Sequence, residues 1–253
     1  MSETRTAIVL GASGSVGGAL VRALLHDGAF DLVITLGRKS LPDVLAMARA
    51  SGSELREQLV PDMTPAALTA ATVGALRDID GDVAAFSVLG IGAGTANMSI
   101  DAHRAVDVEL NAAFARGLRD AGNVRHLAYM TAVGADATAS EAGSGAAGMA
   151  RYNRVKGESE VAVRAQGPAV VSFFRPSMIL GSKHTPWILA KLLPVFSVFT
   201  PSKFRSITAE QIAMAMIATT KAKPTTSAIY HYREMIDAIA RGTTHDAEKG
   251  RTS

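Results

Sequence analysis

Short apolar runs alternate along the chain with longer stretches in which apolar residues recur at helical spacing. This alternation predicts repeated strand–helix units that build a parallel sheet covered by helices. The expected strands are Ala7–Leu10, Leu32–Leu36, a short one around Leu59–Val60, Val83–Leu89, His126–Thr131 and Val170–Phe174, with an added edge strand at Ala228–Tyr232. The expected helices are Ser15–His26, Pro42–Ala50, Pro65–Arg77, Asp101–Asp120, Met149–Ala165 and Thr208–Thr220. Because most of these strands are apolar throughout, we expect a doubly wound, mostly parallel α/β sheet of six or seven strands.

Two segments interrupt this alternation. Residues 134–148 are rich in glycine and follow the carboxyl end of an expected strand, where ligand sites of α/β proteins lie. Residues 181–205 contain three prolines and the single tryptophan, Trp187, and we interpret them as a small C-terminal helical lobe, a lid over a substrate site, or both. The organisation expected is a single domain over residues 1–240, followed by a disordered tail at 241–253 that lacks large apolar side chains.

Composition narrows the class of protein. Hydrophobic residues make up 48% of the chain and charged residues 19%, with a net charge of +3. These values exclude a disordered chain and argue against a dedicated nucleic-acid-binding protein. The chain has no cysteine, and its six histidines match no metal-ligand spacing, so we expect neither a disulfide nor a metal site. The longest uncharged stretch, residues 83–100, is interrupted by glycines, which favours a soluble, cytoplasmic protein without stable membrane insertion.

A glycine-rich turn joins the first expected strand to the first expected helix. Gly11, Gly14 and Gly17 recur at intervals of three residues. This spacing lets the backbone turn sharply and approach a phosphate, while the helix start offers free N–H groups to a pyrophosphate. The residues expected to bind a dinucleotide here are Gly11, Ser13, Gly14, Ser15, Val16 and Gly17. The alternative is a glycine turn that binds no ligand.

The end of the second strand indicates which dinucleotide binds. Asp31 has nearly the sequence offset of a ribose-binding carboxylate, but it begins the second strand. Five or six residues then place it roughly 16–20 Å from the ligand. Arg38 and Lys39 stand at the correct end, where their cations could meet a 2′-phosphate. We therefore expect NADP(H) rather than NAD(H), the alternative being an ordinary solvated turn.

Candidate catalytic residues follow the fifth expected strand. Tyr152 and Lys156 are four residues apart, which on a helix places them on one face. A nearby ammonium favours the phenolate and makes a tyrosine a usable general acid/base near neutrality. Thr131 ends the preceding strand, and its hydroxyl could hold a substrate oxygen beside the tyrosine. Tyr-x-x-x-Lys alone is common by chance, so the hypothesis of a catalytic pair depends on the strand that ends at Thr131 just before it.

Taken together, these motifs resemble those of the short-chain dehydrogenase/reductase superfamily, whose fold is the Rossmann fold. The resemblance is greatest to the atypical branch that includes the Tat-interacting-protein-like oxidoreductases. It spans residues 6–220 and is carried by GASGSVGG, by GRK after the second strand, by VGAD, by YNRVKGESE and by FRPSMILG. Thr131 matches the active-site serine, Tyr152 the tyrosine and Lys156 the lysine. Asp107 stands where many relatives place an asparagine, so the resemblance does not extend to the proton relay at that position.

The resemblance also implies further cofactor contacts. Asp62 matches a residue that faces the adenine amine, Gly90 and its neighbours match the loop under the adenosine ribose, and the segment that begins at Pro176 runs beside the nicotinamide. Lys156 would hold the nicotinamide ribose as well as act on Tyr152. The added cofactor-binding candidates are Asp62, Met63, Leu89, Gly90, Pro176, Ser177 and Met178.

The function expected from these residues is hydride transfer between NADP(H) and a carbonyl or alcohol carbon. The apolar residues of 181–205 suit a small apolar substrate. One alternative is an NADP(H)-binding redox sensor or interaction protein that performs no turnover. Another is an enzyme that resembles a nucleotide-sugar epimerase. The expected partner is a small-molecule substrate and not a nucleic acid, and the chain is expected to be a monomer or homodimer.

Overall fold

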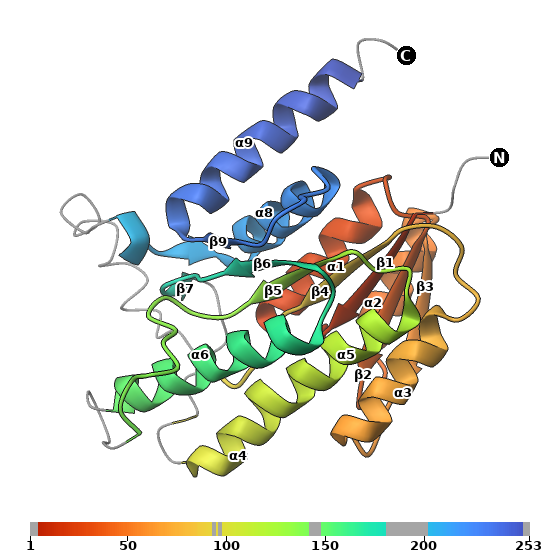
Figure 1. Ribbon diagram of the computed structural model, residues 1–253. Coiled ribbons are helices and arrows are strands. Elements are labelled where there is room, and N and C mark those ends of the chain that lie inside the picture. The colour runs from red at the N-terminus through yellow and green to blue at the C-terminus, as the bar shows by residue number, and fades with distance from the viewer. Residues whose placement is uncertain (1–4, 93–94, 96–97, 142–147, 181–201, 250–253) are drawn as a thin grey trace.

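A seven-stranded parallel sheet forms the centre of the computed structural model, which describes residues 5–92, 95, 98–141, 148–180 and 202–249 (Figure 1). The strands are β1 (Thr6–Leu10), β2 (Leu32–Gly37), β3 (Glu54–Leu59), β4 (Val83–Ser87), β5 (His126–Met130), β6 (Val170–Phe174) and β9 (Ala228–Tyr230). Their order across the sheet is β3-β2-β1-β4-β5-β6-β9, so the direction of winding reverses between β1 and β4. This arrangement confirms the prediction of a doubly wound parallel α/β sheet.

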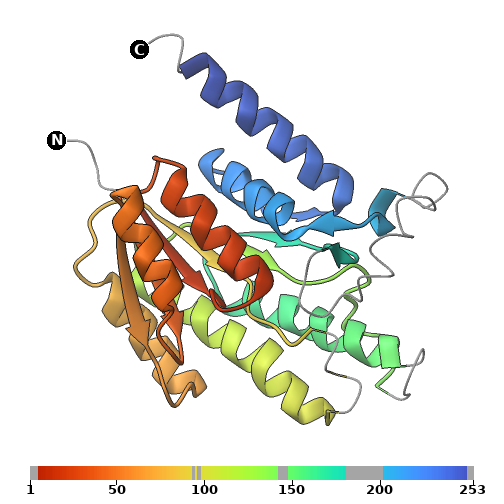
Figure 2. The same ribbon diagram turned by 180° about the vertical axis from the view of Figure 1, so that it is seen from behind.

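Helices cover both faces of the sheet (Figures 1 and 2). One face carries α1 (Ser15–His26), α2 (Pro42–Ser51), α8 (Ala209–Lys221) and α9 (Tyr232–Lys249). The other carries α3 (Pro65–Leu76), α4 (Ile100–Arg104), a π-helical turn (Ala105–Leu110), α5 (Asn111–Ala121) and α6 (Gly148–Gln166). None of the helices in the described part of the chain is long and apolar enough to cross a membrane.

The core lies in two layers, one on each side of the sheet. Along β1, Ala7 and Val9 pack into the layer under α1 and α8, whereas Ile8 and Leu10 pack into the layer under α3 and α5. Side chains of a strand alternate between the two faces, so both sets of β1 side chains are buried. All strand pairs of the sheet are parallel, and their carboxyl ends therefore meet at one edge.

Three elements differ from the sequence prediction. The third strand is Glu54–Leu59 and not a strand around Leu59–Val60, because it is a polar edge strand without an apolar run. The predicted fourth helix is interrupted by the π-helical turn at Ala105–Leu110. The tail expected to be disordered is helical over residues 241–249, as the end of α9. Side-chain bonds from Thr243 and Thr244 to carbonyls of the preceding turn accompany this extension, since small polar residues do not by themselves end a helix.

The segment predicted to form a lid or lobe, residues 181–205, falls for the most part outside the described residues. The residues on either side of the undescribed part are described. β7 (Ile179–Leu180) pairs in parallel with β8 (Ile207–Thr208), and a 3-10 turn covers Ser202–Phe204. The chain therefore leaves and rejoins the body at neighbouring points, beyond the carboxyl end of β6.

Candidate active site

The turn between β1 and α1 is packed too closely to admit side chains. Gly11 has φ +93°, and a Cβ added to it would lie 2.6 Å from the backbone nitrogen of Leu89, in the loop after β4. A Cβ on Gly17 would lie 2.0 Å from the carbonyl oxygen of Gly11. The N–H of Gly14 donates to that same oxygen at 3.1 Å. Strand, turn and helix start thus form a cradle of bare backbone, as a closely approaching phosphate requires.

The first turn of α1 is open to a ligand. Its N-cap residue is Gly14, which has no side chain to accept hydrogen bonds from the first N–H groups. Ser13 and Gly14 are exposed and Ser15 is half-buried, whereas Val16 and Gly17 are buried. Uncapped N–H groups at a helix start carry partial positive charge toward solvent, and this arrangement could hold a pyrophosphate.

Cations lie beside this cradle at the end of β2. Arg38 and Lys39 follow β2 and are exposed. In the described part of the chain, neither forms an ion pair. Asp31 lies at the opposite end of the strand, where its carboxylate accepts a 3.0 Å hydrogen bond from the backbone N–H of Arg5. Asp31 is therefore separated from the glycine cradle by the length of β2, and its exclusion from a dinucleotide site stays a prediction.

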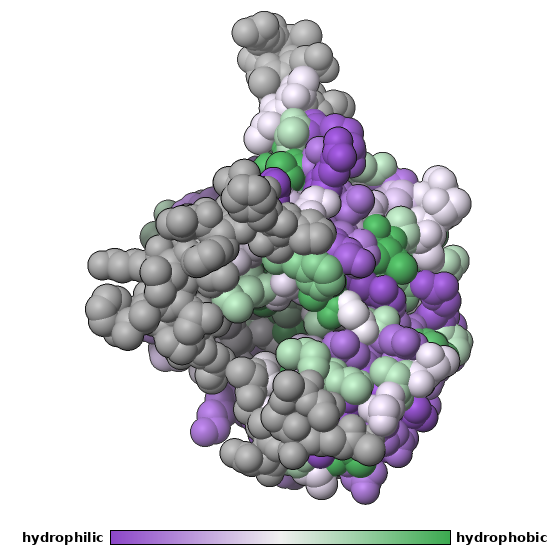
Figure 3. Space-filling model, turned by 90° about the vertical axis from the view of Figure 1, so that its left-hand side faces the viewer, coloured by the Kyte–Doolittle hydropathy of each residue, from purple (hydrophilic) through white to green (hydrophobic). Residues whose placement is uncertain are grey.

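Residues after β3 and β6 reach the same edge of the sheet. Asp62 is exposed and Met63 is half-buried against the α3 side of the core. The carbonyl of Pro176 accepts from the N–H of Val133 at 2.9 Å, and that of Met178 accepts from the N–H of Ile207 at 3.0 Å. The backbone after β6 is thus anchored on both sides, with the half-buried Ser177 between these two points. Figure 3 shows this face, with apolar surface around a hollow near its centre.

Tyr152 and Lys156 form one group on α6. The Nζ atom of Lys156 lies 5.5 Å from the centre of the Tyr152 ring. Lys156 is only 3% exposed, and Tyr152 is half-buried. Burial by itself lowers the pKa of Lys156, but the neighbouring Tyr152 and Asp107 outweigh it and raise this pKa above its usual range. Lys156 is therefore an ammonium ion at neutral pH.

Asp107 is the direct partner of that ammonium. Its Oδ2 lies 2.6 Å from Nζ of Lys156 and 3.0 Å from Nε2 of His103, and its Oδ1 accepts from the N–H of Ile91 at 2.8 Å. The side chain is fully buried. Burial would raise the pKa of Asp107, but the charge of Lys156 and the bonds from its three donors hold the pKa below its usual range. The site thus contains a buried carboxylate paired with a buried ammonium.

The π-helical turn is held by polar side chains from three other elements. The Asp107 carbonyl accepts from the Tyr129 hydroxyl at 3.4 Å, from the Asn111 amide at 2.9 Å and from the Ser159 hydroxyl. The Tyr129 and Ser159 hydroxyls also lie within hydrogen-bond distance of each other, so Tyr129 shares its one proton between Ser159 and the Asp107 carbonyl. Ser87 donates to Asn111 at 2.6 Å. π-Helical turns occur often at functional sites, and this one positions Asp107 under Lys156.

His103 is a member of the group that the sequence reasoning missed. Its ring stacks on that of Tyr152, with centroids 5.7 Å apart and planes at 24°. It is 2% exposed, one turn before Asp107. The available signal was the spacing of four residues between a histidine and an acid on a predicted helix.

Thr131 lies in a different polar group. Its hydroxyl donates to Oε1 of Glu160 at 2.7 Å, and Glu160 forms a two-pronged ion pair with Arg175 at 2.8 and 2.5 Å. Among the contacts of the described residues, none joins Thr131 to Tyr152. Thr131 follows β5 and contacts α6, the helix that carries Tyr152, but its hydroxyl proton is directed to Glu160 on that helix.

The loop after β4 closes the group from the solvent side. A Cβ added to Gly90 would stand 2.8 Å from Nζ of Lys156 and 3.5 Å from both carboxylate oxygens of Asp107. Gly90 is exposed and the preceding Leu89 is half-buried. The candidate dinucleotide cradle and the Lys156–Asp107 pair thus share one loop, because Leu89 also lies against Gly11.

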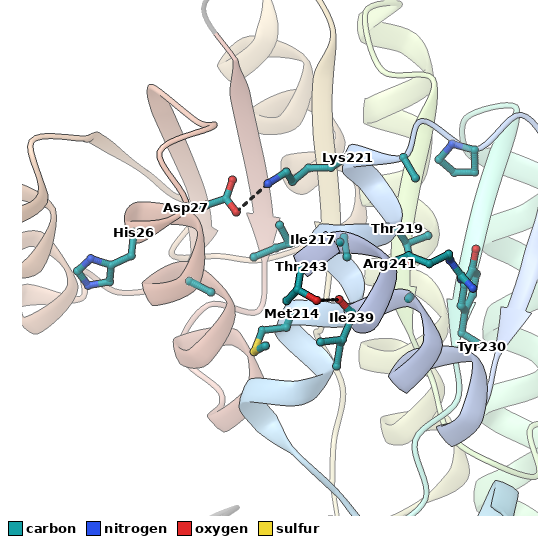
Figure 4. A pocket seen from close by; sticks show the side chains of 16 residues that line it. His26, Asp27, Met214, Ile217, Thr219, Lys221, Tyr230, Ile239, Arg241 and Thr243 are labelled. Carbon is teal, nitrogen blue, oxygen red and sulfur yellow. Dashed lines mark hydrogen bonds and ion pairs between the residues drawn. The ribbon is translucent and has the colours of Figure 1, made fainter. Parts of the chain in front are cut away.

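A separate cavity of about 660 Å³ lies between α1, α8 and α9 (Figure 4). Its wall includes Ile217, Met214 and Ile239, with the Lys221–Asp27 ion pair of 3.2 Å at one end. None of the residues predicted to bind cofactor or substrate lines it. It is formed by the carboxyl end of α1, whereas the glycine cradle is at the start of that helix.

Comparison with solved structures identifies the fold. A short-chain dehydrogenase/reductase from Serratia marcescens superposes with a TM-score of 0.66 at 17% identity, over 92% of this chain and 99% of that one. The fold is that of the short-chain dehydrogenases/reductases. A 3-oxoacyl-[acyl-carrier protein] reductase from Brucella melitensis in complex with NAD has the same fold, with a TM-score of 0.66 at 16% identity over 93% and 99% of the two chains.

A UDP-glucose 4-epimerase from Bifidobacterium longum, in complex with NAD+ and UDP, also superposes on this chain, with a TM-score of 0.61. It is 14% identical, over 89% of this chain and 78% of that one. No family model and no curated protein matches the sequence. The likeness is therefore one of fold, and the predicted relation to the atypical branch stays a prediction.

Proposed function

We propose that the chain is an NADP(H)-dependent oxidoreductase of the short-chain dehydrogenase/reductase type. It would transfer a hydride to or from the carbonyl or alcohol carbon of a small, apolar substrate. The observation that carries this proposal is the Lys156 ammonium 5.5 Å from the Tyr152 ring, in a site that shares a loop with an uncapped glycine cradle. Several structural neighbours described as reductases support it.

Tyr152 is assigned the proton transfer. In reduction its hydroxyl would donate a proton to the substrate oxygen, and the nearby ammonium of Lys156 would stabilise the phenolate that remains. The bound nicotinamide would supply or accept the hydride. An ammonium group has three N–H donors, so Lys156 could hold a ribose hydroxyl while it keeps its bond to Asp107.

Thr131 is a weaker candidate for direct contact with substrate. Its proton is directed to Glu160, so in this arrangement its hydroxyl oxygen could only accept a hydrogen bond. It could receive one from an alcohol but could not donate one to a carbonyl oxygen. Its predicted role in positioning substrate therefore stays a prediction.

The choice of NADP(H) over NAD(H) rests on Arg38 and Lys39, exposed at the carboxyl end of β2. A 2′-phosphate there would form charge-assisted hydrogen bonds that a ribose hydroxyl cannot form. Isothermal titration calorimetry of NADPH and NADH with the full chain tests the choice. Tighter binding of NADPH supports it, and equal affinities contradict it.

Turnover is tested by screening carbonyl compounds for oxidation of NADPH, with Tyr152→Phe as the reference. We expect oxidation that Tyr152→Phe loses while it still binds NADPH. A redox sensor without turnover is the second candidate, favoured if NADPH binds and no compound is reduced. The epimerase alternative is supported by one structural neighbour, and isomerisation of a nucleotide sugar without net NADPH consumption would favour it.

A further inference from the structure

The candidate catalytic lysine has a partner that bears a full negative charge. Nζ of Lys156 is 2.6 Å from Oδ2 of Asp107 and 5.5 Å from the centre of the Tyr152 ring. The carboxylate is therefore at most 8.1 Å, the sum of these two distances, from that centre. Both members of the ion pair are buried, so water screens their charges little. Tyr152 thus faces a cation and an anion, and not a lone cation.

Other titratable groups face this pair from α4, β5 and α6. From α4, Nε2 of His103 bonds to Asp107, and its ring stacks on Tyr152. From β5, Tyr129 reaches the Asp107 carbonyl, and burial raises the pKa of Tyr129 so that it stays neutral. Farther along α6, Glu160 is occupied by its ion pair with Arg175. Lys156 and Asp107 therefore form the ion pair beside Tyr152, and His103 contacts both Asp107 and Tyr152.

We propose that Asp107 is a positioning residue that offsets the charge of Lys156 and so opposes ionisation of the Tyr152 phenol, the group assigned to donate a proton in carbonyl reduction. This inference rests on the proposed function and adds the residue that balances the charge beside Tyr152. In that reaction the hydride and its electron pair go to the carbonyl carbon, the C=O π bond breaks, and Tyr152 gives its proton to the oxygen. The products are the alcohol, the oxidised nicotinamide and a phenolate that regains a proton from solvent.

The size of the effect follows from the geometry. The phenolate oxygen lies about 3 Å from the ring centre, so the two charges are taken as about 8–11 Å apart. At the effective dielectric constant of about 20 that suits protein sites, such a pair changes an ionisation equilibrium by roughly tenfold to thirtyfold. Removal of the Asp107 charge should therefore move ionisation of the Tyr152 phenol to lower pH by about 1 to 1.5 units.

Ultraviolet absorption of tyrosinate measures this without substrate or cofactor. The full chain is titrated as wild type, Asp107→Asn, Lys156→Gln and the double variant, and the trace of Tyr152→Phe is subtracted to isolate Tyr152 from the other three tyrosines. Circular dichroism at each pH confirms that the chain is folded. Glu158→Gln is the matched control, since it removes a carboxylate from α6 that pairs with Arg104 and Arg154 and not with Lys156.

The proposal expects ionisation at lower pH in Asp107→Asn, at higher pH in Lys156→Gln, and near the wild-type pH in Glu158→Gln and in the double variant. The double variant replaces the ion pair by two neutral amides and leaves no unpaired buried charge, so it is the variant best able to fold if Asp107→Asn does not. An unchanged midpoint in Asp107→Asn, or a double variant displaced by one unit or more, would overturn the proposal. Failure to find a substrate would leave these titrations unaffected, so it would count against the proposed function alone.

Discussion

Substitution of Gly17 by alanine tests whether close backbone packing makes the cradle at the start of α1. A Cβ at Gly17 would lie 2.0 Å from the Gly11 carbonyl oxygen and 2.8 Å from Cα of Ala12. Ordinary contacts are near 3.5 Å, so the first turn of α1 would have to move away from the β1 turn by about 1.5 Å. Overpacking of this kind typically costs about 1–3 kcal/mol of stability.

The same displacement should abolish tight dinucleotide binding. A shift of about 1.5 Å lengthens an N–H to oxygen distance from roughly 2.9 Å to beyond hydrogen-bonding range. Loss of two charge-assisted bonds to a pyrophosphate, at about 1.5–3 kcal/mol each, weakens binding by at least a hundredfold. Calorimetric titration with NADPH measures the affinity, and urea denaturation measures the free energy of unfolding.

Gly18 provides the matched control. A Cβ there would have as its nearest neighbour the end of the Arg22 side chain, 3.4 Å away, which can move. Alanine at Gly18 should therefore leave NADPH binding intact and raise stability by up to about 1 kcal/mol, the helix-propensity difference between glycine and alanine. The reasoning is refuted if Gly17→Ala binds NADPH as tightly as Gly18→Ala does, or if the two variants are equally stable.

Three further outcomes are expected. Arg38→Ala should weaken NADPH binding by about 1.5–3 kcal/mol and leave NADH binding unchanged in calorimetry, because it removes a cation that only the 2′-phosphate would contact. With any carbonyl that is turned over, Tyr152→Phe should lower kcat by roughly 10²–10⁴ and keep NADPH affinity within a few-fold, whereas Lys156→Ala should lower both. Burial lowers the pKa of His126 to about 4, so the unfolded chain takes up this proton first. Stability should fall by about 3 kcal/mol as the pH drops from 7 to 4, and His126→Gln should lose this part of the pH dependence in urea denaturation.

The sequence predicted the sheet well because its central strands are buried on both faces and therefore appear in the sequence as continuous apolar runs. The burial of all five β1 residues is what an uninterrupted apolar run implies. Edge elements lack that signal. β3 has only two apolar residues, Leu55 and Leu59, and begins five residues before the predicted strand, and α9 continues through residues that carry no apolar stripe. These elements depend on hydrogen bonding to a neighbour or on extension of an existing helix, and neither leaves a pattern in composition.

Local geometry explains why the candidate site was only partly predicted. Glycine spacing and the Tyr152–Lys156 interval are short-range patterns, and the structure shows a closely packed turn at the first and one helix face at the second. The partners of these residues come from distant segments. Asp107 contacts Lys156 from a π-helical turn that interrupts the fourth helix, and helical periodicity does not reveal such a turn.

The neighbour of Thr131 also could not be predicted from local sequence patterns. The sequence places its hydroxyl at the end of β5, but the choice between Tyr152 and Glu160 as its neighbour depends on how α6 lies across that strand. In the structure Gly157 fixes this contact, since a Cβ there would lie 2.1 Å from the backbone nitrogen of Ala137 in the loop after β5. That close approach seats α6 so that Glu160 receives the Thr131 proton at 2.7 Å. The Tyr152 ring contacts Lys156 and His103, and both of these residues bind Asp107. The residues that we propose to act on Tyr152 are therefore held together by contacts that, among the described residues, do not include Thr131.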